Sequence, residues 1–260
     1  VIVMVLLFMT IVVSTCIWLT RLYYTEHVDL ANRNLSNLLV LQKQFHDHFF
    51  EDLSGLVQFI NTSYQPSRQI NPNTITIHYD AVVRDYPALI QPLLVLDVDG
   101  KVIYDSQPDT PLLDTDLSQQ TYYLAHTQET RTGFFVSPPL ESDKGWSITL
   151  SQAIRDAADN LLGVVKMSLS SELWSESISS LEALQSYSGM IALDDGTILT
   201  GVPYHTDQIA SLIPSTTIDD LRASTSLQPL PSLTASDTVF MKLDTLDHLP
   251  VNLLVTVPFT

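Results

Sequence analysis

Two aspartates, Asp97 and Asp99, follow an apolar run in the sequence LLVLDVDGKVIYDS, residues 93–106. Closely spaced carboxylates of this kind can begin a calcium-binding loop, but the remaining oxygen ligands and the glutamate at the twelfth position are missing here. Asp-Gly between alternating apolar runs is also the strongest short-range signal of a β-hairpin, because a type I′ turn needs positive φ at both central positions. The pattern therefore predicts strand, turn and strand, with the carboxylates at the turn.

The same stretch resembles the first motif of the haloacid dehalogenase-type phosphatases, an apolar strand followed by Asp-x-Asp-Gly-Thr. That resemblance would make Asp97 the nucleophile that attacks phosphorus and Asp99 the acid and base, both around Mg²⁺. However, Lys101 replaces the threonine, no later acidic pair of the Gly-Asp-x-x-x-Asp kind follows an apolar strand, and the region after the motif lacks an alternating βαβ pattern. The phosphatase is therefore a remote alternative, and no catalytic residue is predicted.

Two histidines, His46 and His48, lie in a stretch with helical periodicity. At a spacing of two residues they point away from each other on a helix. His48 could bind a metal together with Glu51 or Asp52, but this set falls short of the usual ligand count, and a solvated helix face is the favoured interpretation. No metal site is predicted.

The hairpin sequence occurs twice, because MIALDDGTILTGVP at residues 190–203 nearly repeats it. Leu193 stands in the second copy at the position of Asp97, so the repeat concerns the fold and not the chemistry. A chain of 260 residues with 45% hydrophobic residues can bury two cores of modest size. The repeat therefore predicts a duplicated domain.

The N-terminal segment is uncharged as far as Arg21, the first charged residue. About twenty apolar residues match the hydrocarbon thickness of a bilayer. A signal peptide would have a shorter apolar region and a cleavage site of small residues, which is missing before Tyr23. Residues 1–20 are therefore predicted to form a transmembrane helix.

This apolar segment is predicted to continue as a long helix over residues 21–62. Apolar residues recur there at spacings of three and four, which indicates one helix face, and a second apolar set widens it. One side could pack on the domain and the other on a partner chain, or the whole stripe could face one core. The two sets are Leu35, Leu38, Phe45, Phe49, Leu53, Leu56 and Ile60, and Leu39, Leu41, Val57 and Phe59.

The first hairpin belongs to a larger predicted unit. A helix with Tyr122, Tyr123 and His126 follows it, and three strand-like runs come next, at residues 133–137, 146–154 and 161–170. Strand, hairpin, helix and three antiparallel strands form an α+β unit of PAS-like shape, a sheet with helices covering its faces. The second hairpin and the last two strand-like runs predict a smaller repeat of this unit.

Other elements are predicted from breakers and periodicity. Pro66 and Pro72 end the long helix, and a short helix is expected over residues 79–89. Helical periodicity at residues 171–185 predicts a connection between the two units. A short helix near residues 207–212, followed by a Ser/Thr/Pro loop, is expected before the last two strands.

The charge balance excludes one class of partner. Twelve basic residues against 29 acidic residues give a formal net charge of −17, and the basic residues do not cluster, so nucleic acid is not a predicted partner. Cys16 is the only cysteine and lies in the apolar segment, which excludes disulfides within the chain and thiolate metal sites.

The sequences DLSQQTYYLAH at 116–126 and GWSITLSQAIRDAADNLLGVVKMSLS at 145–170 complete a pattern. With the long helix and both hairpins, the chain resembles the double Cache (PDC-like) sensor domains of bacterial membrane receptors, most of all those of diguanylate cyclases and histidine kinases. The resemblance implies an α+β fold in which a long helix carries two PAS-like antiparallel-sheet domains. The implied layout is a transmembrane helix at 1–20, a signalling and dimerisation helix at 21–62, a membrane-distal Cache domain at 63–170, a connecting helix at 171–188 and a membrane-proximal Cache domain at 189–260.

This resemblance implies a sensor region of a bacterial inner-membrane signalling protein, with residues 21–260 in the periplasm. It would bind a small molecule, form a homodimer through the long helix and signal to a cytoplasmic output domain. Diguanylate cyclase is the expected output, and a histidine kinase or a chemoreceptor is the alternative. The region itself is expected to be no enzyme and to need no cofactor. A ligand-free dimerisation module is the alternative of another class.

Family members commonly bind their ligand in the distal domain, between the helix after the first hairpin and the sheet. Strand alternation independently gives the strands at 146–154 and 161–170 one face with polar side chains. Such a face needs hydrogen-bond partners, which a ligand, or the protein and water, could supply. The predicted ligand-binding residues are Tyr122, Tyr123, His126, Trp146, Ser147, Thr149, Ser151, Lys166 and Ser168.

The sequence departs from the amine-sensing subtype of this family at two positions. Gln120 replaces an arginine, and Ser168 replaces an aspartate that holds the ligand. Without these fixed charges an amino acid is a poor fit, although Arg131 or Lys166 could compensate for an acidic ligand. Related proximal domains often have Arg-x-Pro after the hairpin, where this chain has Gly201 before Val202-Pro203, so no ligand is predicted there.

Overall fold

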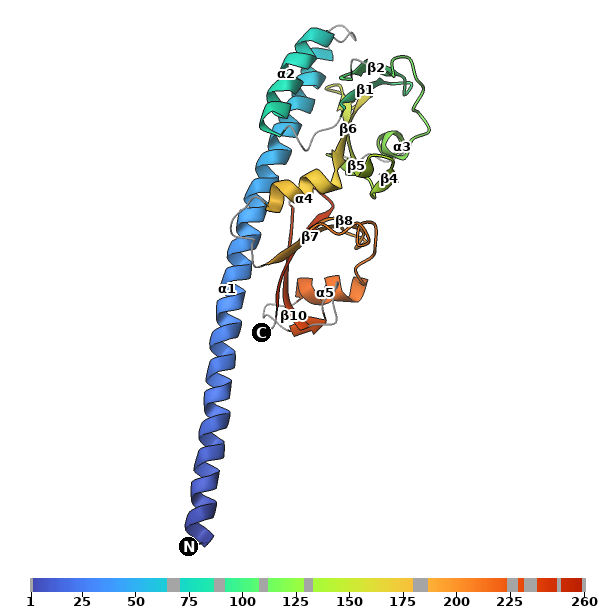
Figure 1. The fold of residues 1–260 in the computed structure, drawn as a ribbon. Helices are drawn as coiled ribbons and strands as arrows, with labels where there is room; N and C mark the ends of the chain where they lie inside the picture. Colours follow the sequence, from blue (N-terminus) through green and yellow to red (C-terminus); the bar gives the residue numbers. More distant parts are fainter. Residues whose placement is uncertain are drawn as a thin grey trace.

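The computed structural model describes residues 2–64, 71–86, 92–107, 112–128, 133–179, 187–223, 229–231, 238–246 and 249–258. One long helix, α1 (Ile2–Tyr64), runs beside two antiparallel sheets that follow one another along it (Figure 1). Both sheets lie beside its C-terminal half, and the first sheet is the farther from the N-terminus (Figure 1). The predicted α+β class, a long helix with two antiparallel sheets, is confirmed.

The predicted transmembrane segment and the predicted long helix form one continuous helix, α1. Its N-terminal part contains an 18-residue window with a mean hydropathy of 1.4, none of which is buried inside the structure. By length and composition, this part of α1 can cross a membrane. A helix of this length is about 95 Å long, so it can connect a bilayer with the first sheet.

The C-terminal half of α1 packs on both sheets through the apolar face that its periodicity predicts. Helix α2 (Pro72–Asp85) lies beside its end (Figure 1). It begins earlier than the helix predicted over 79–89, because Pro72 occupies the first turn, where a missing N–H costs nothing, and the Asn71 side chain caps it. The end predicted for that helix, and Pro66, lie outside the described residues. The buried apolar residues of α1 are Leu35, Leu38, Leu39, Phe49, Phe50, Leu53, Leu56, Val57, Ile60 and Tyr64.

The first sheet has the strand order β2-β1-β6-β5-β3, with β4 also paired to β5. One of its faces packs on α1, and the other is covered by helix α3 (Thr121–Thr127). Because the sheet is covered on both sides, any polar side chain on it must find a partner. Its strands are β1 (Leu94–Asp97), β2 (Val102–Asp105), β3 (Phe135–Val136), β4 (Leu140–Ser142), β5 (Gly145–Arg155) and β6 (Leu161–Ser170).

The second sheet has the order β8-β7-β11-β10-β9. Helix α4 (Ser171–Ser179) joins the sheets and packs on both α1 and β8. The connecting helix was predicted to reach residue 188. In the structure, helix α4 is described as far as Ser179, and Ser188 is the first residue of β7. Residues 180–186 lie outside the described residues. The strands are β7 (Ser188–Leu193), β8 (Ile198–Val202), β9 (Pro229–Pro231), β10 (Thr238–Thr245) and β11 (Val251–Pro258).

Helix α5 (Ser215–Ala223) covers the outer face of the second sheet and was predicted as a loop. The Ser, Thr and Pro residues that suggested a loop instead start a helix, in which Ile218 is buried against the sheet. The short helix predicted near residues 207–212 is wrong, because the structure has turns over most of this segment.

The two hairpins are structural copies. In the first, Asp97 N donates to Lys101 O and Leu117 N donates to Gly100 O; in the second, Leu193 N donates to Thr197 O and Ile213 N donates to Gly196 O. A positive-φ residue follows in each loop, Asp114 at 62° and Ala210 at 63°. The duplication inferred from the sequence therefore extends through the hairpins into the loops behind them.

The turn type of the hairpins differs from the prediction. Gly100 and Gly196 have φ of 82° and 91°, but Asp99 and Asp195 are not among the described residues with positive φ. A type I′ turn would need positive φ at both central residues, so the loops instead close with a left-handed glycine, as in three-residue hairpin loops with a bulge. The pairing of β1 with β2 has such an irregularity between Val95 and Leu96.

A close approach of β1 and β6 supports a test of the first sheet. A Cβ on Gly163 would lie 2.3 Å from the carbonyl oxygen of Leu96. We expect Gly163→Ala to lower the free energy of unfolding by about 2 kcal/mol or more, because the clash is with backbone. Urea unfolding of the chain in lipid nanodiscs, followed by circular dichroism, measures this. Gly55→Ala is the control, since nothing lies within 4 Å of its added Cβ; equal stability of both variants would contradict the β1–β6 register.

Candidate ligand-binding site

The polar residues predicted on β5 and β6 share one face of the first sheet. Thr149 pairs directly with Ser168, and Ser151 pairs directly with Lys166. Residues directly opposite on neighbouring strands point to the same side of a sheet. Leu94 of β1 pairs with Lys166 on its other side, so the row continues across the sheet. We call Thr149, Ser151, Lys166 and Ser168 the polar row.

Helix α3 covers the same face as the polar row. Tyr123 is buried against a cluster that contains Leu94, Leu96 and Val164, and Tyr122 packs on this cluster. The Tyr123 hydroxyl donates to the carbonyl oxygen of Val98 at 2.6 Å, which ties α3 to the first hairpin. Tyr123 therefore has a structural role, because its ring is buried and its hydroxyl is already hydrogen-bonded to the protein.

His126 and Ser151 are hydrogen-bonded to each other. The Ser151 hydroxyl donates to the carbonyl oxygen of Tyr122 at 3.0 Å and lies 3.0 Å from Nε2 of His126. A hydroxyl has one proton, so both bonds form only when Nε2–H of His126 donates to Ser151. Arg155 Nη2 adds a bond of 3.1 Å to the carbonyl oxygen of His126. These contacts fix the end of α3 on β5 and leave the serine hydroxyl no proton for a ligand.

Lys166 is the cation of the polar row. Its side chain is half-buried, and Nζ donates to the hydroxyl of Ser168. Burial lowers the pKa of Lys166, and the charge of Asp105 acts in the opposite direction. Both Asp105 oxygens already accept backbone N–H groups, from Gln107 at 2.8 Å and Leu112 at 2.9 Å. Among the described residues, Lys166 therefore has one neutral hydrogen-bond acceptor and no direct ion pair.

Tyr122 and Thr149 keep polar groups available on the same face. Burial raises the pKa of the Tyr122 hydroxyl to about 12. Neither this hydroxyl nor the Thr149 hydroxyl has a hydrogen-bond partner among the described residues, while Thr149 N donates to Ser137 Oγ at 2.9 Å. A ligand that reached Lys166 could use both hydroxyls. Arg131, the other cation considered from the sequence, lies outside the described residues.

Two of the predicted residues, Trp146 and Ser147, lie at the other end of β5. Trp146 packs against the apolar cluster of the second sheet, which includes Met190, Ile198 and Leu254. Ser147 Oγ donates to the carbonyl oxygen of Leu140 at 3.4 Å. Ser147 stands about 13 Å along the strand from Ser151 at the usual rise per residue. The structure therefore does not bring these two residues to Lys166.

The carboxylate of Asp97 in the first hairpin stabilises the turn through hydrogen bonds to the backbone. Oδ1 of Asp97 accepts the N–H groups of Asp99 and Lys101, each at 2.9 Å. In the second hairpin, Asp195 Oδ1 accepts Thr197 N at 2.9 Å in a similar role. Within the described ranges, no three His, Cys, Asp or Glu side chains form a group that could hold a metal.

Sequence reasoning missed Asp105 and Arg155, which shape the electrostatics and the position of this site. Asp105 pairs across the sheet with Leu94, in the row of Lys166. Only the strand register places it there, so the sequence alone held no signal for it. Arg155 is four residues after Ser151 on β5, so strand alternation puts it on the same face as the polar residues. This spacing is the signal by which the sequence could have indicated it.

Comparison with solved structures identifies the fold. The extracellular domain assigned to the histidine kinase rpHK1S-Z16 matches with a TM-score of 0.72 at 16% identity, over 89% of this chain and 95% of that domain. The chain has the double Cache fold of extracellular sensor domains. The ligand-binding domain of the Campylobacter jejuni chemoreceptor Tlp3, in complex with L-valine, shares this fold at a TM-score of 0.59 and 14% identity, over 91% and 94% of the two chains.

A third sensor supports the same fold at still lower identity. The periplasmic sensory domain of the Campylobacter jejuni chemoreceptor Tlp1 matches with a TM-score of 0.63 at 8% identity, over 90% of this chain and 96% of that domain. No known family's sequence profile matches the chain, and no curated protein sequence matches it. The double Cache fold predicted from the hairpins and the long helix is thus confirmed by structure where overall sequence similarity is low.

Proposed function

We propose that this chain is the extracytoplasmic small-molecule sensor of a bacterial inner-membrane signalling protein, and that it catalyses no reaction itself. The apolar start of α1 would span the membrane, with residues 21–260 in the periplasm. The first sheet, at 63–170, would be the membrane-distal sensor domain, and the second, at 189–260, the membrane-proximal domain. The double Cache fold and the position of the sheets along α1 support this layout (Figure 1).

The half-buried Lys166 carries the proposal for the ligand. An ammonium group removed from water needs an opposite charge or several acceptors, and Lys166 has one neutral acceptor among the described residues. A carboxylate bound to Nζ, with the hydroxyls of Tyr122 and Thr149 beside it, would satisfy it. Ser168 is uncharged, so it offers no anion for the ammonium group of an amino-acid ligand. An organic acid therefore fits this site better than the amino acids bound by Tlp3, valine and isoleucine.

The output would be reached through α1, which is continuous from the apolar segment to the first sheet. Ligand contacts that differ between two packings of α3 on the first sheet would bias the position of α1, and such couplings are about 1–3 kcal/mol. We propose a diguanylate cyclase output on the resemblance to such sensors, with a kinase or chemoreceptor output as the alternative. A homodimer through α1 is part of the same proposal.

A ligand screen on the whole chain in lipid nanodiscs tests the sensor. Thermal shift would be measured with organic acids, amino acids, amines, nucleobases and sugars, because a ligand that binds the folded state raises its stability. We expect an organic acid to give the largest shift. Lys166→Met should weaken its binding about tenfold or more, since a charge-assisted hydrogen bond is lost.

Lys144→Met is the matched control, because Lys144 is an exposed lysine in the turn before β5. It should bind the acid as the unchanged protein does. Tight binding that survives Lys166→Met would contradict the assignment of Lys166. A screen without any hit on folded protein would favour the ligand-free dimerisation module, in which protein side chains take the place of a ligand, as the bond between His126 and Ser151 does in part of the site.

A further inference from the structure

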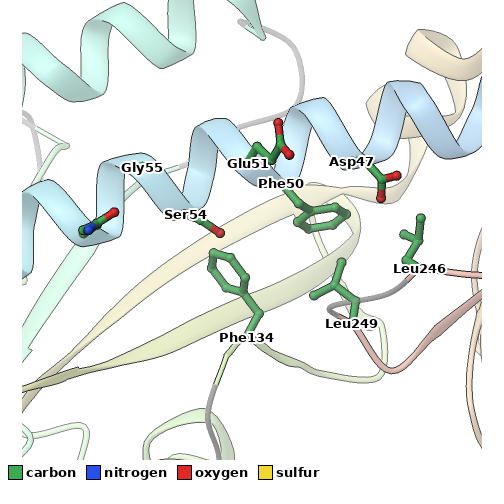
Figure 2. Close-up of a pocket in the computed structure, with 9 residues that line it drawn as sticks. Asp47, Phe50, Glu51, Ser54, Gly55, Phe134, Leu246 and Leu249 are labelled. Carbon is green, nitrogen blue, oxygen red and sulfur yellow. The ribbon is translucent and has the colours of Figure 1, made fainter.

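A separate cavity lies between α1, the first sheet and two leucines that follow β10, Leu246 and Leu249 (Figure 2). Its volume is about 590 Å³, which is within the range of small-molecule sites. None of the residues of the polar row lines it. Whatever binds there would therefore be a second ligand, distinct from the one proposed at Lys166.

Part of the wall of this cavity is aromatic and aliphatic. The ring centroids of Phe50, on α1, and Phe134, just before β3, are 6.2 Å apart. Leu246 and Leu249, from the segment after β10, line the cavity as well (Figure 2). The ligand should therefore have an apolar body, and the ring faces also suit a cation, which aromatic quadrupoles attract.

Gly55 opens the cavity on the side of α1. It is the only glycine of this helix, and a Cβ added to it would meet nothing within 4 Å. Glycine inside a helix costs about 1 kcal/mol relative to alanine. A side chain at this position would extend into the space at the cavity wall, so the glycine keeps this space empty at a cost in helix stability.

Two carboxylates at the cavity give it a negative charge. Asp47 is half-buried and Glu51 is exposed, one turn apart on α1. Neither has a hydrogen bond or an ion pair within the described ranges, and no Lys or Arg is among the lining residues. Unpaired carboxylates next to an apolar, aromatic wall complement a ligand with a positive head and an apolar body.

We propose that this cavity binds a small organic cation, a protonated amine with an aromatic body. The ammonium group is held by Asp47 and Glu51, and the ring lies against Phe50 and Phe134. Such a ligand touches α1, Phe134 beside the first sheet, and Leu246 and Leu249 together. Its binding would therefore fix the three parts relative to one another.

Isothermal titration calorimetry on the whole chain in nanodiscs of zwitterionic lipid tests this proposal, with empty nanodiscs subtracted. The probes are 2-phenylethylamine, the neutral 2-phenylethanol and the anionic 3-phenylpropionate, which have similar sizes. We expect saturable binding of the amine alone. Asp47→Asn should weaken it about tenfold or more. Gly55→Leu should abolish it while the melting temperature stays equal or rises, because leucine favours the helix and fills open space.

Two control variants and one further measurement separate the alternatives. Glu141→Gln removes an exposed carboxylate on β4 and should leave binding of the amine unchanged. Lys166→Met should also leave it unchanged, so the two sites succeed or fail independently. The proposal is overturned if the amine does not saturate, if the alcohol binds equally well, or if Gly55→Leu still binds. A change of oligomeric state in Asp47→Asn or Gly55→Leu, measured by mass photometry, would instead assign the cavity to an interface between copies.

Discussion

Replacing Trp174 by alanine is expected to lower the free energy of unfolding by about 3–5 kcal/mol, the usual cost of truncating a large buried aromatic residue. Trp174 lies in α4 and is 0% exposed. Its ring centroid is 5.7 Å from that of His46 and 6.3 Å from that of Phe50, both on α1. The truncation would leave a cavity between α1 and the helix that joins the two sheets.

The position of α4 makes this effect more than local. Ser175 Oγ donates to the carbonyl oxygen of Gly201, and Thr200 Oγ1 donates to the carbonyl oxygen of Ser171 at 2.6 Å, so α4 is bonded to the second sheet. With Trp174 removed, α4 would keep these bonds but lose its packing on α1.

Urea unfolding of the chain in nanodiscs, followed by circular dichroism, measures the change. Trp146→Ala is the matched control, because Trp146 is only half-buried and packs at the edge of the second apolar cluster. It should cost about half as much, or less. If both variants lost the same stability, Trp174 would not be the centre of the packing between α1 and α4.

The elements that the sequence predicted correctly are specified by local chemistry. An Asp-Gly pair between apolar runs defines a hairpin without help from distant residues, and both hairpins formed. The long helix follows from apolar spacing that begins at Leu35 and ends at Ile60, and all the residues at this spacing except Phe45 are buried. In these two hairpins and the long helix, only the predicted turn type of the hairpins was wrong, because Asp99 does not need positive φ when Gly100 closes the loop.

The elements that the sequence missed depend on partners far along the chain. Helix α5 looks like a loop by composition and becomes a helix because Ile218 is buried on the second sheet. Pro72 was taken as a breaker, although a proline begins a helix as readily as it ends one. Propensity is a weak prior, and tertiary packing overrides it in such short segments.

In the candidate site, too, the features set within one strand could be predicted, and those that depend on distant elements could not. Strand alternation placed Thr149 and Ser151 on one face of their strand and Lys166 and Ser168 on one face of theirs, because alternation is a property of each strand by itself. The pairing of β5 with β6 then brings the two polar faces to the same side of the sheet. It could not show that Ser151 would be bonded to His126, since that bond depends on where α3 docks. Nor could it show that Trp146, at the start of β5, would pack on the second sheet.

Lowering the pH from 7 to 4 is expected to reduce the free energy of unfolding by about 3 kcal/mol through His46 alone, at about 1.4 kcal/mol per pKa unit. The side chain is 0% exposed, and its burial lowers the pKa from 6.5 to about 4, although the bond to the Gln42 carbonyl acts in the opposite direction. Nδ1 donates to that carbonyl at 2.6 Å, and Nε2 has no hydrogen-bond partner among the described residues. A second proton would therefore charge a buried ring that has no acceptor for it.

The sign follows from proton binding. Between pH 6.5 and pH 4 the unfolded chain binds a proton at His46 and the folded chain does not, so acid favours unfolding. The loss begins near 6.5, is nearly complete near 4, and does not continue below that value. Sequence reasoning did not anticipate this group, because helix periodicity does not show that Trp174 of α4 would lie beside the imidazole.

His46→Gln isolates this contribution, because glutamine is uncharged throughout this range and other titrating groups are common to both proteins. Stability would be measured by urea unfolding at several pH values, and the difference between the two proteins should shrink or change sign as the pH falls through 6.5 towards 4. His48→Gln, an exposed position on the same helix, should keep the full pH dependence. A constant difference between unchanged protein and His46→Gln would mean that His46 accepts its proton in the folded state, and that α4 does not exclude water from this part of α1.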